Sequence, residues 1–171
     1  DALLVIAPRH TERGGAIAAL AAGAPRRALR EEIGQAPVYI ADTMGELGLF
    51  YAAAPVSLVA GSLLPAYAGH NPAEPAKLGS AILSGPHVAS FADLYAAFEA
   101  ASAMRFVRDA DAIAANVARL WADSAAREAM AAHARGVAEA GGGALEETIA
   151  ALAAILRAAR PQQSRTLHAP A

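Results

Sequence analysis

The sequence predicts an α/β fold, a Rossmann-like three-layer domain built on a parallel sheet and followed by C-terminal helices. Two observations carry this prediction. Short apolar runs of strand length alternate with helical segments as far as Val107, and strands separated by helices imply parallel pairing. Beyond Asp109 the pattern is helical only, which predicts a set of packing helices at the C-terminal side.

The expected strands are short runs rich in apolar residues. In chain order they are residues 3–7, 38–41, 56–60, 81–84 and, as an edge strand, 104–107. A weaker run at residues 28–30 is assigned to a strand as well. Parallel strands present their carboxyl ends at one edge of the sheet, where open α/β sheets bind ligands.

Helical spacing of apolar residues predicts the helices between and after these strands. In chain order they are residues 11–22, 45–53, 72–78, 91–101, 109–122, 124–140 and 144–158. Gly23 closes the first helix, Asp109 caps the fifth, and Asp123 or Ser124 caps the sixth. The last three helices are alanine-rich and are expected to cover the sheet and to brace a neighbouring domain.

With 171 residues, of which 56% are hydrophobic, the chain is sized for one core. We expect a single domain over residues 1–158 and a disordered, proline-bounded tail over residues 159–171. The chain opens in a strand-like pattern without an initiator methionine. We therefore expect that an upstream part is missing from it.

Composition excludes several classes of function. A formal net charge of -2 and nine scattered aromatic residues make nucleic acid a poor partner. The absence of cysteine excludes disulfides, thiolate zinc sites, cysteine nucleophiles and iron–sulfur clusters. The five histidines are scattered without metal-ligand spacing, so no metal is expected. Because no apolar run is long enough to span a membrane and no signal peptide is seen, the chain is expected to be cytosolic and soluble, with no transmembrane segment.

Residues 69–75, Gly-His-Asn-Pro-Ala-Glu-Pro, are the most informative stretch. A helix that begins near Pro72 would point free N–H groups and the positive end of its dipole at an anion. Glu74, in the first turn, would accept hydrogen bonds from a ribose diol. This combination of groups is typical of a nucleotide-sugar site.

Polar clusters follow four of the expected strands and converge on one edge of the sheet. They are Pro8-Arg9-His10, Asp42-Thr43-Met44-Gly45-Glu46, Gly61-Ser62 and Gly85-Pro86-His87. Arg9 would grip a phosphate with both guanidinium arms, and the helix start at Gly45 and Glu46 would hold a phosphate or a base edge.

Each of these residues also has a structural alternative. Arg9 would otherwise pair with Glu12 or Glu46 on the surface, and the helix start at Gly45 would simply be capped by Asp42 or Thr43. For Glu74 the alternative is a first-turn carboxylate stabilised by the helix dipole. His70 could equally hydrogen-bond within its loop.

Taken together, five motifs in order resemble the bacterial Kdo (3-deoxy-D-manno-octulosonic acid) transferases, and the match extends over most of residues 1–157. The motifs are Pro8-Arg9-His10, Asp42-Thr43-Met44-Gly45-Glu46-Leu47-Gly48, Gly61-Ser62, Gly69-His70-Asn71-Pro72-Ala73-Glu74-Pro75-Ala76 and Gly85-Pro86-His87. One departure is Ala68, where the family has the first of two glycines, in a loop one residue longer than the usual form. Because alanine restricts the backbone more than glycine, this departure concerns the path of loop 64–70.

The resemblance implies the C-terminal, donor-binding half of a GT-B glycosyltransferase. Such an enzyme moves Kdo from CMP-Kdo to the lipid A precursor in lipopolysaccharide biosynthesis, at the cytoplasmic face of the bacterial inner membrane. The resemblance implies that CMP is contacted by Pro8, Arg9, Met44, Gly45, Glu46, Asn71, Pro72, Ala73 and Glu74. Further candidate contacts are Thr43, Gly61, Ser62, Gly69 and His70.

The family also implies what this chain is not expected to contain. Its general base is a glutamate of the N-terminal half, which also binds the acceptor and docks on the membrane and is absent from this chain. We therefore expect no catalytic residue here, no cofactor and no metal, and weak CMP binding without catalysis by the chain alone. Two alternatives stay open: the C-terminal half of a GT-B transferase or epimerase that uses a UDP-sugar, and a non-catalytic nucleotide-binding domain.

Overall fold

The computed structural model describes residues 2–141 and 143–158. The chain divides into two compact units, residues 1–138 and the part from Glu139 onward, and each is described by itself. The first unit holds all the described strands. They are β1 (Leu4–Ile6), β2 (Val38–Ile40), β3 (Val56–Val59), β4 (Ala81–Ser84) and β5 (Met104–Phe106).

The helices follow the strands in alternation, as the sequence predicts. They are α1 (Gly14–Leu20), α2 (Leu47–Ala53), α3 (Ala73–Lys77), α4 (Ala92–Ala100), α5 (Ala110–Ala122), α6 (Ser124–Ala140) and α7 (Gly143–Ala158). Short 3-10 turns lie between them: η1 (Thr11–Arg13), η2 (Arg27–Leu29), η3 (Ala60–Ser62), η4 (Pro65–Tyr67) and η5 (Ala89–Phe91). The expected caps are present, because Asp109 accepts a hydrogen bond from the Ala112 N–H and Asp123 accepts one from the Ala126 N–H.

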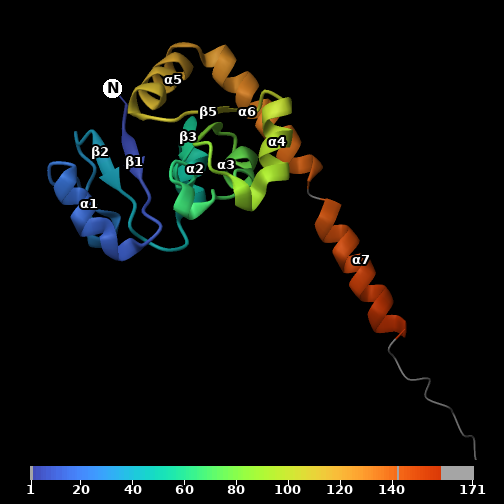
Figure 1. Cartoon of the computed structure of the whole chain (residues 1–171). Helices are drawn as coiled ribbons and strands as arrows, with labels where there is room; N and C mark the ends of the chain where they lie inside the picture. Colours follow the sequence, from blue (N-terminus) through green and yellow to red (C-terminus); the bar gives the residue numbers. More distant parts are fainter. Residues whose placement is uncertain (1, 142, 159–171) are drawn as a thin grey trace, which may run out of the picture. The chain divides into compact units, whose positions relative to one another are not determined.

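All strand pairs are parallel, which confirms the predicted α/β class. The strands form two hydrogen-bonded groups where the sequence predicted one sheet. One group is β1–β2, and the other has the order β3–β4–β5 with β5 at an edge. Figure 1 shows β1 and β2 beside α1, apart from the other three strands. Sequence patterns indicate strands but not which strands pair, so they could not reveal this division.

The prediction of a strand at residues 28–30 is wrong. This stretch belongs to the 3-10 turn η2, and Arg30 closes it in the left-handed conformation with φ 58°. The reason is that backbone N–H groups here donate to carboxylates and not to a neighbouring strand. The Ala28 N–H donates to Asp42, and the nearby Arg26 N–H donates to Glu31. In the described part of the chain, an isolated bridge joins Arg26, just before this stretch, to Ile40 of β2.

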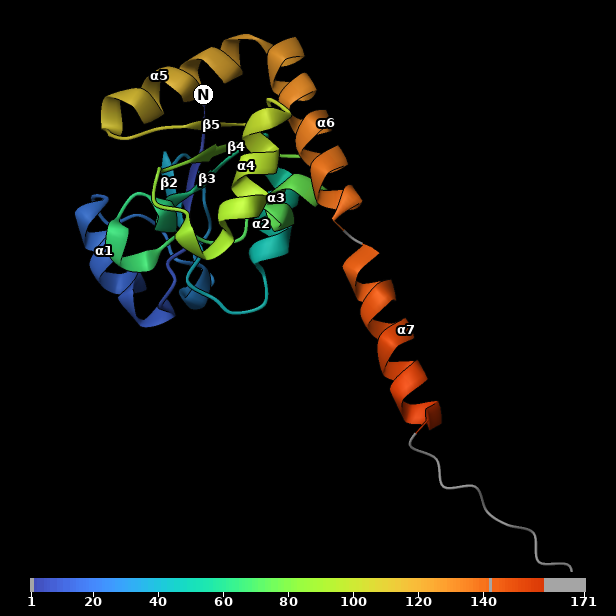
Figure 2. The same cartoon turned by 45° about the vertical axis from the view of Figure 1, so that its right-hand side comes forward.

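The β3–β4–β5 sheet is covered on both faces (Figures 1 and 2). Along β4 alternate residues point to opposite sides, as strand geometry requires. Ala81 and Leu83 pack with Leu120 and Val107 under α5. Ile82 packs in a second cluster with Phe98 and with other residues of α3, α4 and α6. This double burial explains why β4 reads as a continuous apolar run in the sequence.

The β1–β2 pair has its own small core beneath α1. Ala18 and Ala24 close over Ile40, with Ile6 and Val38 beside them. On the opposite face of β2, the ring of Tyr39 lies 6.4 Å from the ring of Phe50 in α2. Strand β2 therefore packs against α1 on one face and against α2 on the other.

Ala68 takes a left-handed conformation with φ 50° and ψ 19°. Its carbonyl accepts a hydrogen bond from the Ser90 N–H at 3.0 Å. The next residue, Gly69, is also left-handed, with φ 88°. Two consecutive residues of the loop thus adopt the left-handed conformation that glycine favours, although the first of them is alanine.

The second unit contains α7, whose large described apolar side chains are exposed: Ile149, Leu152, Ile155 and Leu156. The expected disordered tail at residues 159–171 lies outside the described residues. Among the residues that the structure describes, no helix has both the length and the apolar character needed to cross a membrane.

Candidate functional site

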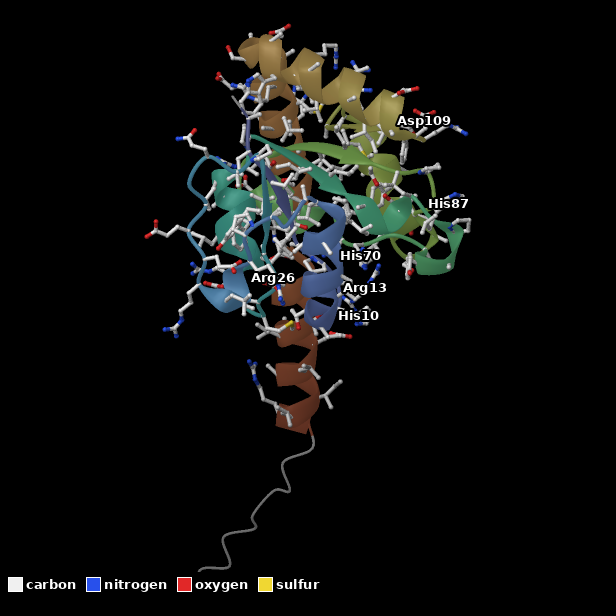
Figure 3. All side chains as sticks on the ribbon, turned by 90° about the vertical axis from the view of Figure 1, so that its left-hand side faces the viewer. His10, Arg13, Arg26, His70, His87 and Asp109 are labelled. Atoms are coloured by element: carbon white, nitrogen blue, oxygen red, sulfur yellow. The ribbon has the colours of Figure 1, made fainter. Side chains whose placement is uncertain are left out.

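The candidate site lies at the carboxyl ends of the strands. In Figure 3 the labelled His10, His70, His87 and Asp109 all lie toward one side of the view. His10, His87 and Asp109 follow β1, β4 and β5, and His70 precedes α3. The polar segments that the sequence singled out after separate strands therefore reach one edge of the unit.

Ser62 joins the segment after β3 to the segment after β4. Its hydroxyl accepts a hydrogen bond from the Gly85 N–H at 2.6 Å, and its carbonyl accepts one from the His87 N–H at 2.9 Å. The Ser62 hydroxyl in turn donates to the Val59 carbonyl. Ser62 is fully buried, so its role in this structure is to lock two backbone segments together.

Glycine allows the loop before α3 to come close to both of these segments. A Cβ added to Gly61 would lie 1.9 Å from Nδ1 of His70, so the imidazole rests directly on the Gly61 backbone. A Cβ on Gly69 would lie 3.0 Å from the His87 carbonyl oxygen. Gly61, Ser62, Gly69 and His70 are thus brought together around His87, and their main role is close packing of backbone.

The start of α3 presents the expected polar groups. The Asn71 side chain accepts a hydrogen bond from the Ala73 N–H at 2.9 Å, while Pro72 is buried. Glu74 is exposed and has no hydrogen bond or ion pair among the described residues. Burial, and after it the negative charge of Glu74, raises the pKa of Tyr51 in α2. The carboxylate of Glu74 is therefore free to accept hydrogen bonds from a ligand.

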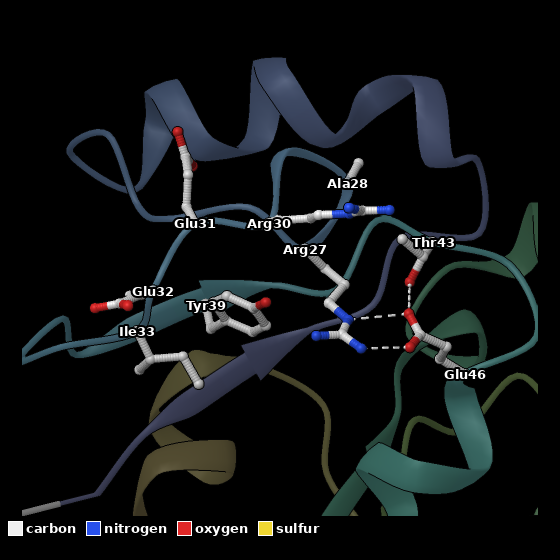
Figure 4. Close-up of a pocket in the computed structure, with 9 residues that line it drawn as sticks. All are labelled: Arg27, Ala28, Arg30, Glu31, Glu32, Ile33, Tyr39, Thr43 and Glu46. Carbon is white, nitrogen blue, oxygen red and sulfur yellow. Dashed lines mark hydrogen bonds and ion pairs between the residues drawn. The ribbon is translucent and has the colours of Figure 1, made fainter.

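The segment after β2 is more constrained than its sequence suggests. Met44 is 81% exposed, and Gly45 is left-handed with φ 82°. Glu46, at the start of α2, accepts hydrogen bonds from Arg27 Nη2 at 2.6 Å and Nε at 3.1 Å and from the Thr43 hydroxyl at 2.5 Å. Figure 4 shows this bidentate pair. The Glu46 carboxylate is therefore already hydrogen-bonded within the protein. The groups that this segment can offer to a ligand are its backbone N–H donors.

Asp42 holds the segment after β2 through hydrogen bonds to residues 26 and 28. It is buried and lies 2.7 Å from both Nε and Nη2 of Arg26, and it also accepts a hydrogen bond from the Ala28 N–H. Burial raises the pKa of Asp42, but these hydrogen bonds and the charge of Arg26 outweigh it, so the net shift is downward. A Cβ on Gly14 would lie 2.0 Å from Asp42 Oδ2, so the start of α1 packs against this carboxylate. Neither Asp42 nor Thr43 caps α2.

An open hollow of about 800 Å³ lies beside the Arg27–Glu46 pair (Figure 4). Tyr39, Thr43 and the charged residues of the segment after η2 line it. Only Thr43 and Glu46 of the expected nucleotide contacts belong to this hollow. It is therefore separate from the loops around His70.

Hydrogen bonds from Arg27 and Thr43 lower the pKa of Glu46 to about 2. Because the folded-state pKa lies below the unfolded one, the pair stabilises the fold fully above the unfolded pKa, and this stabilisation is lost as the pH falls toward 2. We expect Arg27→Met to raise the pKa of Glu46 toward the ordinary value of a glutamate, while the Thr43 hydroxyl, which still donates to the carboxylate, keeps part of the lowering. Carboxyl-carbon NMR titration of both proteins measures this, and an unchanged Glu46 pKa in the variant would show that the ion pair is absent in solution.

Arg9 follows β1 and is exposed, and Pro8 before it is half-buried. Neither expected alternative pairing forms, since Glu46 binds Arg27, and Glu12 lies 3.7 Å from His10. In the described part of the chain, no ion pair or side-chain hydrogen bond engages the Arg9 guanidinium. It is thus an unpartnered cation at the carboxyl end of β1.

The structure brings some expected site residues into contact and leaves others apart. The residues around His70 form one group and those around Glu46 form another, linked by the packing of α2 on α3. No hydrogen bond or ion pair between described residues connects Arg9 to either group. Sequence reasoning did not identify Arg26 and Arg27 as residues that shape the site. A usable signal was present, because two adjacent arginines precede β2 and two acids, Asp42 and Glu46, follow it. Among the described residues, no three His, Asp or Glu side chains gather into a group that could hold a metal ion.

Comparison with curated proteins gives several named relatives. The chain is 34% identical over 108 residues to a protein of Arabidopsis thaliana named "Probable 3-deoxy-D-manno-octulosonic acid transferase, mitochondrial", which covers 60% of this chain and 24% of that protein. It is 34% identical over 158 residues to the 3-deoxy-D-manno-octulosonic acid transferase of Bordetella pertussis, covering 88% of this chain and 36% of that protein. The chain thus spans about a quarter to a third of the length of these relatives. No protein-family model matches it.

A solved structure is similar over most of the chain. It is the C-terminal CMP-Kdo binding domain of WaaA from Acinetobacter baumannii, with a TM-score of 0.74 and 31% sequence identity. The similarity covers 79% of this chain and 72% of that domain. Both the Rossmann-like α/β fold and the resemblance inferred from the five motifs are confirmed by this comparison.

Proposed function

Since this chain belongs to the Kdo transferase family, we propose that it is the donor-binding half of a glycosyltransferase and binds CMP-Kdo. The observation that carries the proposal is the similarity to a solved domain described as CMP-Kdo binding, at 31% identity over 79% of the chain. The exposed Arg9, the free carboxylate of Glu74 and the turn at Gly45 supply a cation, a diol acceptor and backbone donors, which are the groups that a nucleoside monophosphate needs.

The proposed contacts are Pro8, Arg9, Met44, Gly45, Glu46, Asn71, Pro72, Ala73 and Glu74. In this assignment Arg9 meets the phosphate and Glu74 meets the ribose. The Glu46 carboxylate is held by Arg27, so we assign Glu46 a contact through its backbone N–H. Thr43, Gly61, Ser62, Gly69 and His70 shape the surrounding backbone.

Transfer breaks the bond between the anomeric carbon of Kdo and the phosphate oxygen of CMP, so negative charge grows on the departing phosphate. Preorganised donors stabilise such charge most when they are in place before the reaction. We propose that Arg9 and the N–H groups at the starts of α2 and α3 do this. The proposal assigns this stabilisation to the protein's own groups and keeps the expectation that no metal is needed.

The acceptor side belongs to the rest of the protein in this proposal. A second half would carry the general base, bind the lipid A precursor and dock on the cytoplasmic face of the inner membrane. Closure of the two halves would exclude water and align the reactants. The 171-residue chain alone is therefore expected to bind the nucleotide weakly and to transfer no Kdo.

A titration of this chain with CMP, followed by backbone amide shifts, tests the proposal. UMP and UDP serve as controls, because a UDP-sugar enzyme would prefer the uridine nucleotides. We expect selective shifts with CMP at Arg9, Gly45 and Asn71, at millimolar concentrations. Preference for UMP or UDP would overturn the CMP assignment, and so would a lack of response to every nucleotide.

A further inference from the structure

Three buried hydroxyl groups lie in a row beneath the candidate site, within hydrogen-bond distance of one another. They belong to Ser62, Ser84 and Tyr95, which are 0%, 0% and 1% exposed. The Ser84 hydroxyl lies 2.7 Å from the Ser62 hydroxyl and 3.2 Å from that of Tyr95, and its single proton can be donated to either. Ser62 ends the turn η3 that follows β3, Ser84 ends β4, and Tyr95 lies in α4.

The two outer hydroxyls of this row donate to backbone carbonyls. At one end Ser62 donates to the Val59 carbonyl. At the other end Tyr95 donates to the His70 carbonyl at 2.9 Å. His70 directly precedes Asn71, so the hydroxyl of a core helix holds the backbone that leads into α3 and its carboxylate Glu74.

Little else holds this backbone. Among the described residues, the hydrogen bond from Tyr95 is the one that reaches the backbone N–H and C=O groups of residues 69–71. Gly69 has a left-handed backbone that other residues adopt at a cost, and Gly61 gives the His70 ring a surface to rest on but no hydrogen bond. Among the described residues, the Tyr95 hydroxyl thus makes the one hydrogen bond from another element to this backbone, next to the Asn71 side chain that accepts from the Ala73 N–H.

The ring of Tyr95 is held independently of its hydroxyl. It lies in the apolar cluster with Phe98 and Met104, and it stacks on Phe106 with ring centroids 6.2 Å apart. Removing the oxygen alone should therefore leave the ring in place, while the partly buried His70 carbonyl loses its donor. The effect on the loop can thus be separated from damage to the core.

We infer that Tyr95, supported by Ser84, is a positioning residue that fixes the loop of residues 69–74 for nucleotide binding. The inference rests on the proposed function, because it is that function which places the ligand against Asn71 and Glu74. Tyr95 itself is fully buried and touches no ligand. Its contribution passes through the His70 carbonyl.

The test compares Tyr95→Phe and Ser84→Ala with a matched control, Ser80→Ala. The buried hydroxyl of Ser80, which directly precedes β4, pairs at 2.7 Å with that of Ser57 in β3. Between described residues, neither serine forms a hydrogen bond with the loop of residues 69–74. Ser80→Ala also leaves a buried hydroxyl, that of Ser57, without its partner. The control therefore reproduces a loss of stability without altering the loop.

Two readouts are taken on the full chain. Nitrogen-15 relaxation of the ligand-free protein is expected to give lower order parameters for residues 69–71 and 73–74 in Tyr95→Phe, and wild-type values in Ser80→Ala. CMP is expected to bind Tyr95→Phe about fivefold more weakly than wild type, which is the size of one net hydrogen bond. Ser84→Ala should give a smaller change in the same direction.

The outcomes separate the two ideas. Failure of the wild-type chain to bind CMP would overturn the proposed function, and the relaxation data, which need no ligand, would still decide the role of Tyr95. Unchanged order parameters in Tyr95→Phe would overturn the inference. So would an equal loss of CMP affinity in Ser80→Ala, because the effect would then follow from stability alone.

Discussion

Gly85→Ala is expected to lower the free energy of unfolding by about 3 kcal/mol, because the added methyl group has no space. A Cβ at this position would lie 2.3 Å from the Ser62 carbonyl oxygen and 2.5 Å from the Leu63 nitrogen. Both are backbone atoms, so no flexible side chain can move aside. The segments after β3 and β4 would have to separate, which would weaken the 2.6 Å and 2.9 Å hydrogen bonds from Gly85 and His87 to Ser62.

Urea unfolding followed by circular dichroism measures this loss, with Gly136→Ala as the matched control. Gly136 lies in α6, and a Cβ there would meet nothing within 4 Å. Alanine is favoured over glycine inside a helix, so the control should gain about 0.5–1 kcal/mol. If Gly85→Ala unfolded at the same urea concentration as wild type, the close approach of Gly85 to Ser62 would not exist in solution.

The sequence predicted elements well where burial leaves a regular pattern. Strand β4 is recognisable because both of its faces are buried, which makes all its residues small or apolar except the terminal Ser84. Helix α6 begins and ends where the sequence predicts. It has a start signal in Asp123, whose carboxylate accepts the Ala126 N–H as a cap does. In these places local propensity and tertiary packing require the same residues.

Prediction failed where side chains far apart in the sequence decide the structure. The backbone near Ala28 is shaped by Asp42, a buried carboxylate 14 residues away that takes its N–H, and no local pattern encodes that demand. The same holds for Arg27 and Glu46, which are 19 residues apart. A pair of arginines and a pair of acids can be seen in the sequence, but only the fold tells which partners meet.

The sequence predicted individual segments of the candidate site but not the contacts that hold them in place. The motif residues 69–75 could be identified as a helix start with a diol-seeking carboxylate, and α3 does begin there. The dependence of this segment on Tyr95 could not be identified, because the hydroxyl donates to a backbone carbonyl 25 residues away and that contact leaves no trace in residue type. Hydrogen bonds from a side chain to a distant backbone carbonyl cannot be predicted from sequence motifs.

Arg9→Met is expected to weaken CMP binding about thirtyfold, because a phosphate loses a charge-assisted hydrogen-bond partner. The fold should be unaffected, since Arg9 is exposed and, within the described chain, forms no ion pair. Arg9→Lys keeps the charge but not the planar fork, so an intermediate affinity is expected. Amide-shift titration of the three proteins with CMP gives the dissociation constants directly.

Arg13→Met is the control that isolates the role of position from the loss of a charge. Arg13 is also exposed, lies in the turn that follows Arg9, and has no ion pair among described residues. If the general field of positive charge attracted CMP, both variants would weaken binding alike, and added salt would abolish the difference from wild type in each. If Arg9 grips the phosphate at contact distance, Arg13→Met binds CMP nearly as wild type does, and Arg9→Met alone loses affinity at every salt concentration. Wild-type affinity in Arg9→Met would remove Arg9 from the site and leave the phosphate to the backbone donors of α2 and α3.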